Sequence, residues 1–285
     1  MKFGKILLIA IPLVGLLYSS CDKIKAPYAL AKHGNIVDTV LDWDTVMPVK
    51  RVLLEDYTGH KCPNCPAAAT IAHSQEENYN GKLIVLAVHA GYYAIPSSGE
   101  FSADFRTTAG EAWNTDFQIS AYPSGMIDRM EFNGHQVIGS AEWVTDIAGI
   151  INQSSALNML ITNSYDTASM KVYSLIYSQF RRSLPGSYNI TVCVVEDNMI
   201  SAQDSASTII HNYIFKDVLR GSVNGTYGET LTASVDPALT YLGKFSIPID
   251  IAWVPENCWI LAFVSKSDTR EIIQVIKKKV IVISG

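Results

Sequence analysis

Two cysteines separated by two residues carry the strongest chemical signal in this sequence. Cys62-Pro63-Asn64-Cys65 has the spacing at which one helical turn brings two sulfur atoms within bonding distance. Such a pair can alternate between a dithiol and a disulfide and can exchange with the thiols of other proteins. The N-terminal thiol of the pair is expected to be the more exposed one. We therefore predict that Cys62 is the nucleophile and that Cys65 resolves the mixed disulfide.

The residues around the pair predict a strand, a helix and a second strand. Residues 49–57 are β-like, residues 67–79 favour a helix, and residues 83–89 form a continuous apolar run. Such a run is typical of a parallel strand that is covered on both faces. The cysteines would then lie where a strand passes into a helix, and the free N–H groups and dipole of a helix start stabilise a thiolate. Pro63 suits the first helical position, which needs no N–H.

The residues beside the pair leave several roles open. His60 and Lys61 directly precede Cys62, and a nearby cation would lower the pKa of that thiol; a solvated turn would contain the same residues. A structural zinc site needs further ligands, and the remaining strand cysteines are isolated, so no metal is predicted. Pro66 stands where a c-type haem site needs histidine, and no other cofactor motif is present. A purely structural disulfide remains an alternative, and a buried Cys62 would favour it.

The N-terminus predicts export and a lipid anchor. Lys2 and Lys5 form a basic start, residues 6–18 are apolar, and Cys21 follows at the predicted cleavage site. The apolar run is too short to span a bilayer as a helix. The segment resembles a bacterial lipobox, so Cys21 is predicted to be lipidated and to attach the mature chain to a membrane. An ordinary cleaved signal with a nearby cysteine is the alternative.

Composition narrows the class of protein. The chain has 285 residues, of which 48% are apolar and 17% charged, with a net charge of −5. This balance excludes a disordered tail and gives no basic footprint for nucleic acid. Removal of the signal would take both lysines with it and leave −5 − 2 = −7 on the mature chain. An exported protein works where disulfides persist.

The chain after the strand-helix-strand unit changes character near residue 155. Helices are expected over residues 102–117 and 140–152, with Ser140 as a plausible N-cap of the second. Repeated β patterns follow, over residues 157–162, 170–180, 188–196, 247–253, 259–264 and 272–283. They favour an antiparallel β-sandwich. Cys193 and Cys258 lie in these strands, and the sequence leaves open whether they pair.

A later segment and the motif together resemble the thioredoxin-like family. In that fold a cis-proline faces the redox cysteines, and Pro123, after Tyr122, matches its position in chain order. The resemblance implies that the backbone at Tyr122 and Pro123 offers an edge to an extended substrate peptide. It also implies that Asp56, six residues before Cys62, is a buried proton acceptor for Cys65; an exposed strand acid is the alternative. Residues 91–117 are an insertion that would cover or reshape the site.

A closer resemblance covers most of the chain. VLLEDYTGHKCPNC, YPSGMIDR and HNYIFKDVLRGSVNGTYGE are similar to segments of the outer membrane protein 28 family of bacterial lipoproteins. That family implies a thioredoxin-like domain followed by a β-rich domain at the outer membrane or cell surface, and it implies no substrate. We therefore predict four segments: a lipoprotein signal peptide (1–20), a tether (21–48), an α/β thioredoxin-like domain (49–155) and an all-β antiparallel sandwich domain (156–285).

Two functions follow from these observations. The first is thiol–disulfide exchange by a lipid-anchored protein, with protein thiols or disulfides as partners and the membrane as its place of attachment. The alternative is a non-enzymatic surface lipoprotein with a structural disulfide and a β domain that binds a partner or a glycan. The sequence decides neither the direction of exchange, nor the substrate, nor the membrane face, nor the oligomeric state.

Overall fold

The strand-helix-strand unit is present in the computed structural model, which describes residues 35–36, 49–206 and 208–281. It consists of β2 (Val52–Thr58), α1 (Cys65–Asn78) and β3 (Leu83–His89). β2 and β3 pair in parallel along their whole length, and every residue of both strands is buried. The continuous apolar pattern of the second strand therefore predicted its environment correctly.

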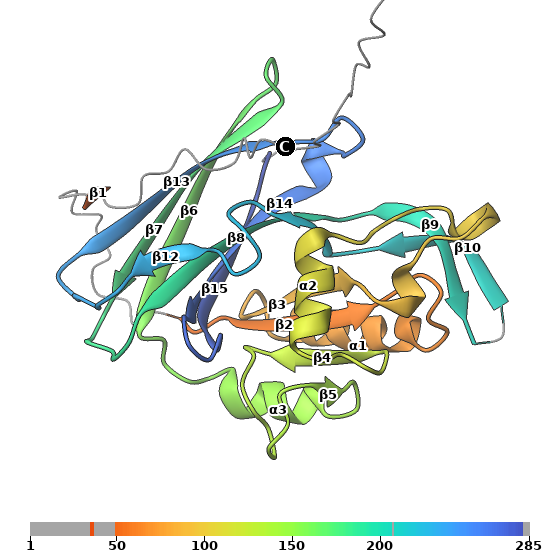
Figure 1. Cartoon of the computed structure of the whole chain (residues 1–285), viewed down its shortest axis with the longest axis horizontal. Helices are drawn as coiled ribbons and strands as arrows, with labels where there is room; N and C mark the ends of the chain where they lie inside the picture. Colours follow the sequence, from red (N-terminus) through yellow and green to blue (C-terminus); the bar gives the residue numbers. More distant parts are fainter. Residues whose placement is uncertain (1–34, 37–48, 207, 282–285) are drawn as a thin grey trace, which may run out of the picture.

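These two strands belong to a nine-stranded mixed sheet (Figure 1). Its order is β15-β14-β8-β11-β3-β2-β4-β5, with β12 also paired to β8. The added strands are β4 (Ser124–Ile127), β5 (Ile138–Gly139), β8 (Tyr188–Glu196), β11 (Val218–Ser222), β12 (Glu229–Thr232), β14 (Cys258–Lys266) and β15 (Ile272–Lys279). β11 joins the two halves, because it pairs with β8 on one side and, through Val218 and Ala87, in parallel with β3 on the other. The sheet thus crosses residue 155, and the division into two domains stays a prediction.

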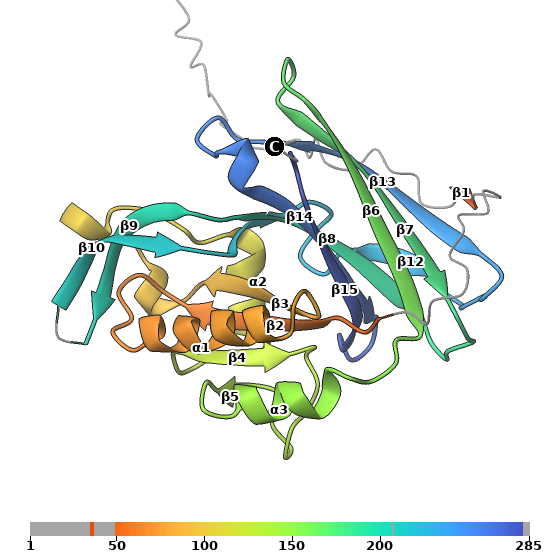
Figure 2. The same ribbon diagram turned by 180° about the vertical axis from the view of Figure 1, so that it is seen from behind.

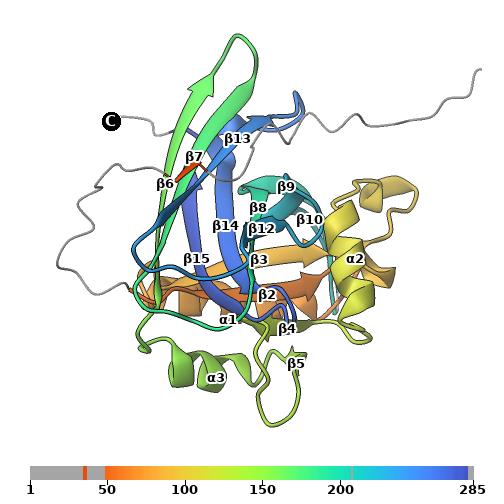
Figure 3. The ribbon, with the colours of Figure 1, turned by 60° about the vertical axis from the view of Figure 1, so that its left-hand side comes forward.

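A second, antiparallel sheet packs on the β8–β14–β15 part of the first (Figure 3). It has the order β1-β13-β7-β6, with β1 at Asn35–Ile36, β6 at Leu157–Asp166, β7 at Lys171–Phe180 and β13 at Thr240–Pro248. The core between the two sheets holds Ile161, Ile176 and Phe245 from one sheet and Val192 and Ile260 from the other. An antiparallel sheet packed on the antiparallel part of a mixed sheet matches the β-rich architecture that the alternating patterns predicted.

The three α-helices of the described residues cover the other end of the large sheet. α1 and α2 (Thr108–Asp116) lie on opposite faces of β2 and β3 (Figures 1 and 2). α3 (Trp143–Ile150) packs on the α1 side, where Trp143 is fully buried. The described residues also form short 3₁₀ turns: η1 (Tyr92–Ala94), η2 (Gly99–Phe101) and η3 (Pro255–Asn257).

Three predicted element boundaries are wrong for local reasons. The helix expected from residue 102 begins only at Thr108, because the Thr107 side chain accepts the Gly110 N–H and caps the helix there. The helix expected from Ser140 has Glu142 as its N-cap instead. The strand expected over residues 247–253 ends at Pro248, and the Asp250 carboxylate then accepts the Ala252 N–H in a turn.

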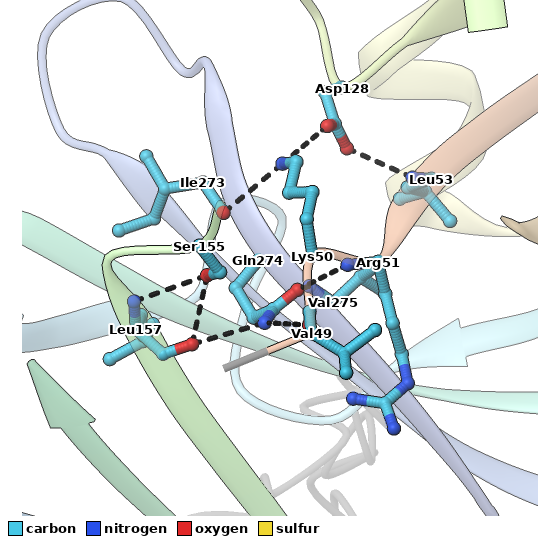
Figure 4. Close-up of polar contacts among 10 residues, drawn as sticks. All are labelled: Val49, Lys50, Arg51, Leu53, Asp128, Ser155, Leu157, Ile273, Gln274 and Val275. Atoms are coloured by element: carbon cyan, nitrogen blue, oxygen red, sulfur yellow. Dashed lines mark hydrogen bonds and ion pairs between the residues drawn. The ribbon is translucent and has the colours of Figure 1, made fainter. Parts of the chain in front are cut away.

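Gln274 in β15 connects the large sheet by hydrogen bonds to the segment before β2 and to the start of β6 (Figure 4). Its Nε2 donates to the carbonyl oxygens of Val49 and Leu157, each at 3.0 Å. Its Oε1 accepts the N–H of Arg51 at 2.8 Å and that of Val275 at 3.3 Å. Val49 and Arg51 precede, and Leu157 follows, the part of the chain that contains the three α-helices, which we call the helical region. One buried side chain therefore connects three distant parts of the chain. We call the region of these contacts the Gln274 seam.

Charged groups at the Gln274 seam are also paired. The Lys50 Nζ lies 2.6 Å from Asp128 Oδ2 and donates to the carbonyl oxygen of Ile273 at 3.1 Å. The other carboxylate oxygen of Asp128 accepts the Leu53 N–H at 2.9 Å. All three side-chain contacts are drawn in Figure 4. The buried ammonium and carboxylate therefore compensate each other.

β9 (Met199–Ser205) and β10 (Thr208–Phe215) form a two-stranded sheet of their own. Figures 1 and 2 show this hairpin at one end of the molecule, beside η2. Most of its residues are exposed or half-buried, and Ala202, Gln203 and Phe215 are its buried members. The hairpin therefore contributes little to the main cores, and its inner side meets the cysteine pair.

Candidate functional site

Cys62 and Cys65 form a disulfide at the junction of β2 and α1. Cys62 lies in the turn after β2, and Cys65 is the first residue of α1, preceded by Asn64 as the N-cap. Pro66, and not Pro63 as predicted, occupies the first helical turn, where its missing N–H costs nothing. The helix start is therefore at the second cysteine of the pair.

The prediction that Cys62 is the more exposed cysteine is wrong. The exposed fraction is 0% for Cys62 and 2% for Cys65. The β9–β10 hairpin covers the turn: Gln203 Nε2 donates to the Cys62 carbonyl at 3.0 Å, and the Asp204 N–H donates to the His60 carbonyl at 2.8 Å. The Ala206 N–H adds a bond to the Pro63 carbonyl at 3.1 Å. The cover comes from a segment about 140 residues away in the chain, so local patterns around the motif did not indicate it.

Aromatic side chains from the insertion close a second side. Phe101 stacks on the His60 ring at 5.6 Å between centroids, and Phe105 meets the same ring edge-on at 5.8 Å. Burial and neighbouring Lys61 lower the pKa of His60. The Lys61 ammonium itself lies 5.7 Å from the centre of the Tyr92 ring. The two predicted tuning residues therefore contact the insertion.

Asp56 is buried beside Cys65. It is 2% exposed, and it lines a cavity of about 20 Å³, room for about one water molecule, together with Cys65, His73 and His89. Within the described part of the chain, its Oδ1 has no hydrogen-bond partner. Burial raises the pKa of Asp56 to about 7, against a lowering effect of His73. This is a carboxyl group that can take up and release a proton near neutral pH.

His89, the last residue of β3, is a site residue that the sequence reasoning missed. Both of its ring nitrogens lack a hydrogen-bond partner among the described residues, and the ring packs edge-on against Phe105 and Phe215. Burial, with smaller contributions from His60 and Arg220, lowers its pKa to about 3. The available signal was a histidine at the end of an otherwise apolar strand.

Tyr122 and Pro123 lie at the start of β4. Their peptide bond is cis, and the following residue, Ser124, pairs with Tyr57 of β2. The Tyr122 hydroxyl donates to the Asn114 side chain, and its ring meets Tyr93 edge-on at 5.9 Å. Tyr93 in turn accepts the Lys61 N–H through its carbonyl. Tyr122 and Pro123 are thus connected to the motif through β2 and the insertion.

A group of ionisable side chains lies on the far side of the cavity. His73 Nδ1 is 3.5 Å from Asp217 Oδ2 and 3.8 Å from Glu76 Oε2. The ligand atoms of these three residues lie within 4.8 Å of one another, as in a metal site. However, Lys277 Nζ already lies 2.5 Å from Asp217 and 3.4 Å from Glu76. Because this ammonium already compensates the carboxylates, we assign no metal to the group.

Cys193 and Cys258 are unpaired. Both are buried, and they belong to different apolar cores on the large sheet. Burial raises the pKa of each thiol to about 12, so neither forms a thiolate readily. These cysteines are inert core residues, which resolves the question that the sequence left open.

The predicted lipidation site, Cys21, the signal peptide and most of the tether lie outside the described residues. None of the helices in the described residues has the length and hydrophobicity of a membrane-spanning segment.

Comparison with known proteins identifies both a family and a fold. The model of the family "Outer membrane protein Omp28" matches residues 110–283, more than half of the chain. No curated protein matches the sequence significantly. Among solved structures, HBP35 of Porphyromonas gingivalis is similar with a TM-score of 0.61 and 17% identity, over 81% of this chain and 76% of that one. Likeness at this identity concerns the fold alone.

Two further solved structures are similar. A structural-genomics protein from Agrobacterium tumefaciens has a TM-score of 0.52 and 11% identity, over 84% of this chain and 98% of that one. A domain of the outer membrane lipoprotein Omp28 from Porphyromonas gingivalis has 22% identity over 44% of this chain and 88% of that one. The TM-score of the latter is 0.31, which supports no comparison of folds.

Proposed function

The chain belongs to the Omp28 family of outer membrane proteins, and from this premise we propose that it exchanges thiols and disulfides at that membrane through Cys62 and Cys65. Its place is the outer membrane or the cell surface, as for the lipoproteins of its family. Cleavage before Cys21 and acylation of that residue would provide the anchor, with residues 21–48 as the tether. Its partners would be protein thiols or disulfides.

The proposal includes a thioredoxin-like arrangement for residues 49–155 and a sandwich domain for residues 156–285. The parallel β2–α1–β3 unit, with β4 antiparallel to β2, supports the first of these. The two packed sheets support the second. In this arrangement Pro123 precedes the strand next to β2, so Tyr122 and Pro123 would offer backbone groups to an extended substrate segment.

Asp56 is the observation that carries the redox proposal. A buried carboxyl group with an unpartnered oxygen is costly, and a disulfide that only cross-links the chain has no use for it. Asp56 shares its cavity with Cys65, and its pKa of about 7 suits proton transfer at neutral pH. Perturbed carboxyl groups of this kind concentrate at functional sites.

The reaction would begin when a substrate thiolate attacks the Sγ of Cys62. A substrate–Cys62 disulfide forms as the Cys62–Cys65 bond breaks, and the electron pair leaves on the Sγ of Cys65. Protonated Asp56 gives its proton to this thiolate and becomes a carboxylate. A second substrate thiolate then attacks the mixed disulfide and releases Cys62 as a thiolate. The substrate is oxidised to a disulfide, and the protein holds the dithiol; the reverse sequence reduces a substrate.

Access to Cys62 requires the β9–β10 hairpin to separate from residues 59–63, because the cysteine is 0% exposed. His60 and Lys61 lie in the turn that this motion would uncover, where Lys61 would stabilise the Cys62 thiolate. Local opening of a peripheral element costs less than unfolding of the core.

The burial of Cys62 also favours a second function. A fully covered disulfide fits a structural cross-link in a non-enzymatic surface lipoprotein, whose β-rich part would bind a partner or a glycan. Under this alternative Asp56 is a buried group without a chemical role.

One experiment separates the two functions. The Cys65→Ser variant, expressed in its own compartment, should accumulate mixed disulfides through Cys62, because the resolving thiol is absent. Cys62→Ser is the matched control, since it leaves only the thiol that is not expected to react with substrate. Partners released by dithiothreitol from Cys65→Ser alone would support exchange. A lack of trapped partners, together with a wild-type reduction potential below about −300 mV, would establish a structural disulfide.

A further inference from the structure

Redox exchange at this site requires a route for protons. Opening the disulfide creates a thiolate on Cys65, and Asp56 has one proton to give before it must be reprotonated. Asp56 and Cys65 are each 2% exposed, so their direct contact with bulk water is small while the hairpin covers the site. A side chain that contacts both the cavity and a solvent-open surface would provide the route.

His73 is the cavity residue that meets this requirement. Cys65, Ala69 and His73 are spaced four residues apart on one face of α1 and all line the cavity with Asp56. His89 lines it too, but burial lowers its pKa to about 3, so it stays neutral. Imidazole is the side chain that exchanges protons most readily near neutral pH.

The other side of His73 faces acceptors that reach an open cleft. Its Nδ1 is 3.5 Å from Asp217 and 3.8 Å from Glu76. Both carboxylates line a cleft of about 550 Å³ together with Lys277 and Trp259. The side chains from Cys65 through Asp56 and His73 to Asp217 thus run from the narrow cavity beside the disulfide to a wider cleft that water can enter.

We propose that His73 is a positioning residue that passes protons between Asp56 and the carboxylate of Asp217. The inference rests on the proposed exchange through Cys62 and Cys65. After Asp56 has protonated the Cys65 thiolate, the imidazolium of His73 returns a proton to the Asp56 carboxylate. His73 then takes a proton from Asp217, and Asp217 takes one from water in the cleft, so that Asp56, His73 and Asp217 all return to their starting protonation states.

The charges that face His73 suit this role. Asp56 faces it from β2, Glu76 from α1 itself, and Asp217 from the residue before β11. Burial raises the pKa of Asp217 to about 6, against the lowering effect of Lys277 on β15. Lys216 and Tyr213 border the cavity from the same segment, and burial raises the pKa of Tyr213, so that hydroxyl does not ionise near neutral pH. A proton can therefore reside on either side of the imidazole at neutral pH.

The test compares reduction of the wild-type disulfide and of His73→Gln by dithiothreitol, across about pH 5 to 8. Released thiols are alkylated and counted at each time. Because the reductant itself ionises, the variant rate is divided by the wild-type rate at each pH. We expect His73→Gln to react about tenfold more slowly near neutral pH. The ratio of the two rates should change across this pH range, because the relay contributes only to the wild-type rate. His135→Gln, which alters an exposed histidine, is the control and should match the wild type.

A second variant distinguishes loss of the imidazole from a loss of folded structure. His73→Ala should be slow and should regain rate when imidazole is added, because the ring can enter from the cleft. Equal wild-type and His73→Gln rates and profiles would overturn the relay, as would a slow His73→Ala that imidazole does not rescue. If dithiothreitol reduces the wild-type disulfide but Cys65→Ser traps no partner, the proposed function is overturned. The proton route is then still decided by the rates of the His73 variants. A wild-type disulfide that dithiothreitol cannot reduce would overturn both.

Discussion

The Gln274 seam and the disulfide site lie on the same sheet but differ in whether their buried polar groups have partners. At the seam, each amide atom of Gln274 has two backbone contacts, and the buried Lys50 and Asp128 neutralise each other (Figure 4). At the disulfide, Asp56 Oδ1 and both ring nitrogens of His89 lack partners within the described residues. At the seam, hydrogen bonds and an ion pair thus compensate the buried polar groups, whereas polar groups beside the disulfide lack hydrogen-bond partners.

This difference indicates that the polar groups beside the disulfide lower the stability of the fold. Unpartnered buried ionisable groups destabilise a fold, and natural proteins retain them mainly at sites of chemistry. The polar groups of the Gln274 seam stabilise the junction between the helical region and the sandwich. Those around Cys65 instead hold perturbed pKa values beside a reactive bond. Three substitutions test this contrast.

The largest effect is expected at the Gln274 seam. Gln274→Ala removes four hydrogen bonds and leaves partly buried groups such as the Arg51 N–H without this partner. We expect the free energy of unfolding to fall by about 4 kcal/mol, measured by urea denaturation at pH 7. Gln153→Ala, at an exposed glutamine, is the matched control and should stay within about 0.5 kcal/mol of the wild type. A loss of less than about 1 kcal/mol for Gln274→Ala would refute the structural role of the seam.

The next effect is the dependence of stability on pH that Asp56 causes. Its pKa is about 7 in the folded protein and 3.8 ordinarily, so unfolding releases its proton over this interval. The contribution of protonated Asp56 to the free energy of unfolding is therefore fully present below pH 3.8. It is lost as the pH rises to about 7. From pH 5 to pH 8, Asp56→Asn should lose about 3 kcal/mol less stability than the wild type.

The control for Asp56→Asn is Glu77→Gln, an exposed carboxyl on α1. Its stability should follow the wild-type curve at both pH values. Parallel curves for the wild type and Asp56→Asn would show that Asp56 titrates normally, and the contrast with the seam would disappear.

The smallest change in stability is expected at the cover of the disulfide. Gln203→Ala removes the bond from the hairpin to the Cys62 carbonyl but keeps the two backbone bonds to His60 and Pro63. We expect about 1 kcal/mol lower stability but about tenfold faster reduction by dithiothreitol, because local opening becomes easier. Gln153→Ala again serves as the control. An unchanged reduction rate would mean that the hairpin does not limit access.

Local patterns in the sequence predicted much of the architecture. The apolar run of residues 83–89 marked a buried parallel strand, and the alternating segments after residue 155 marked antiparallel strands. The CxxC spacing identified the pair that forms the disulfide. The roles of Asp56, Tyr122 and Pro123 came from a family resemblance and stay predictions. Element ends were missed where a side chain or a proline stops a regular pattern, as at Thr107 and Pro248.

The candidate site was only partly visible because its members are far apart in the chain. Gln203 contacts a carbonyl 141 residues away, and Asp217 meets His73 from a different strand connection. No periodicity links such residues, since each lies in a segment whose own pattern is ordinary. The fold places His73, one polar position on a helix surface, at the narrow cavity and beside two carboxylates that line the cleft.

The available chemistry follows from local sequence: a cysteine pair at the end of a strand, an acid six residues earlier and a chain built mainly of strands. These features depend on spacing and side-chain type, which local structure preserves. Tertiary structure decided whether that chemistry is accessible. The β9–β10 hairpin buries Cys62, and β11 joins both halves in one sheet through Val218 and Ala87. Burial and long-range pairing depend on which distant segments meet, and that follows from the packing of the whole chain.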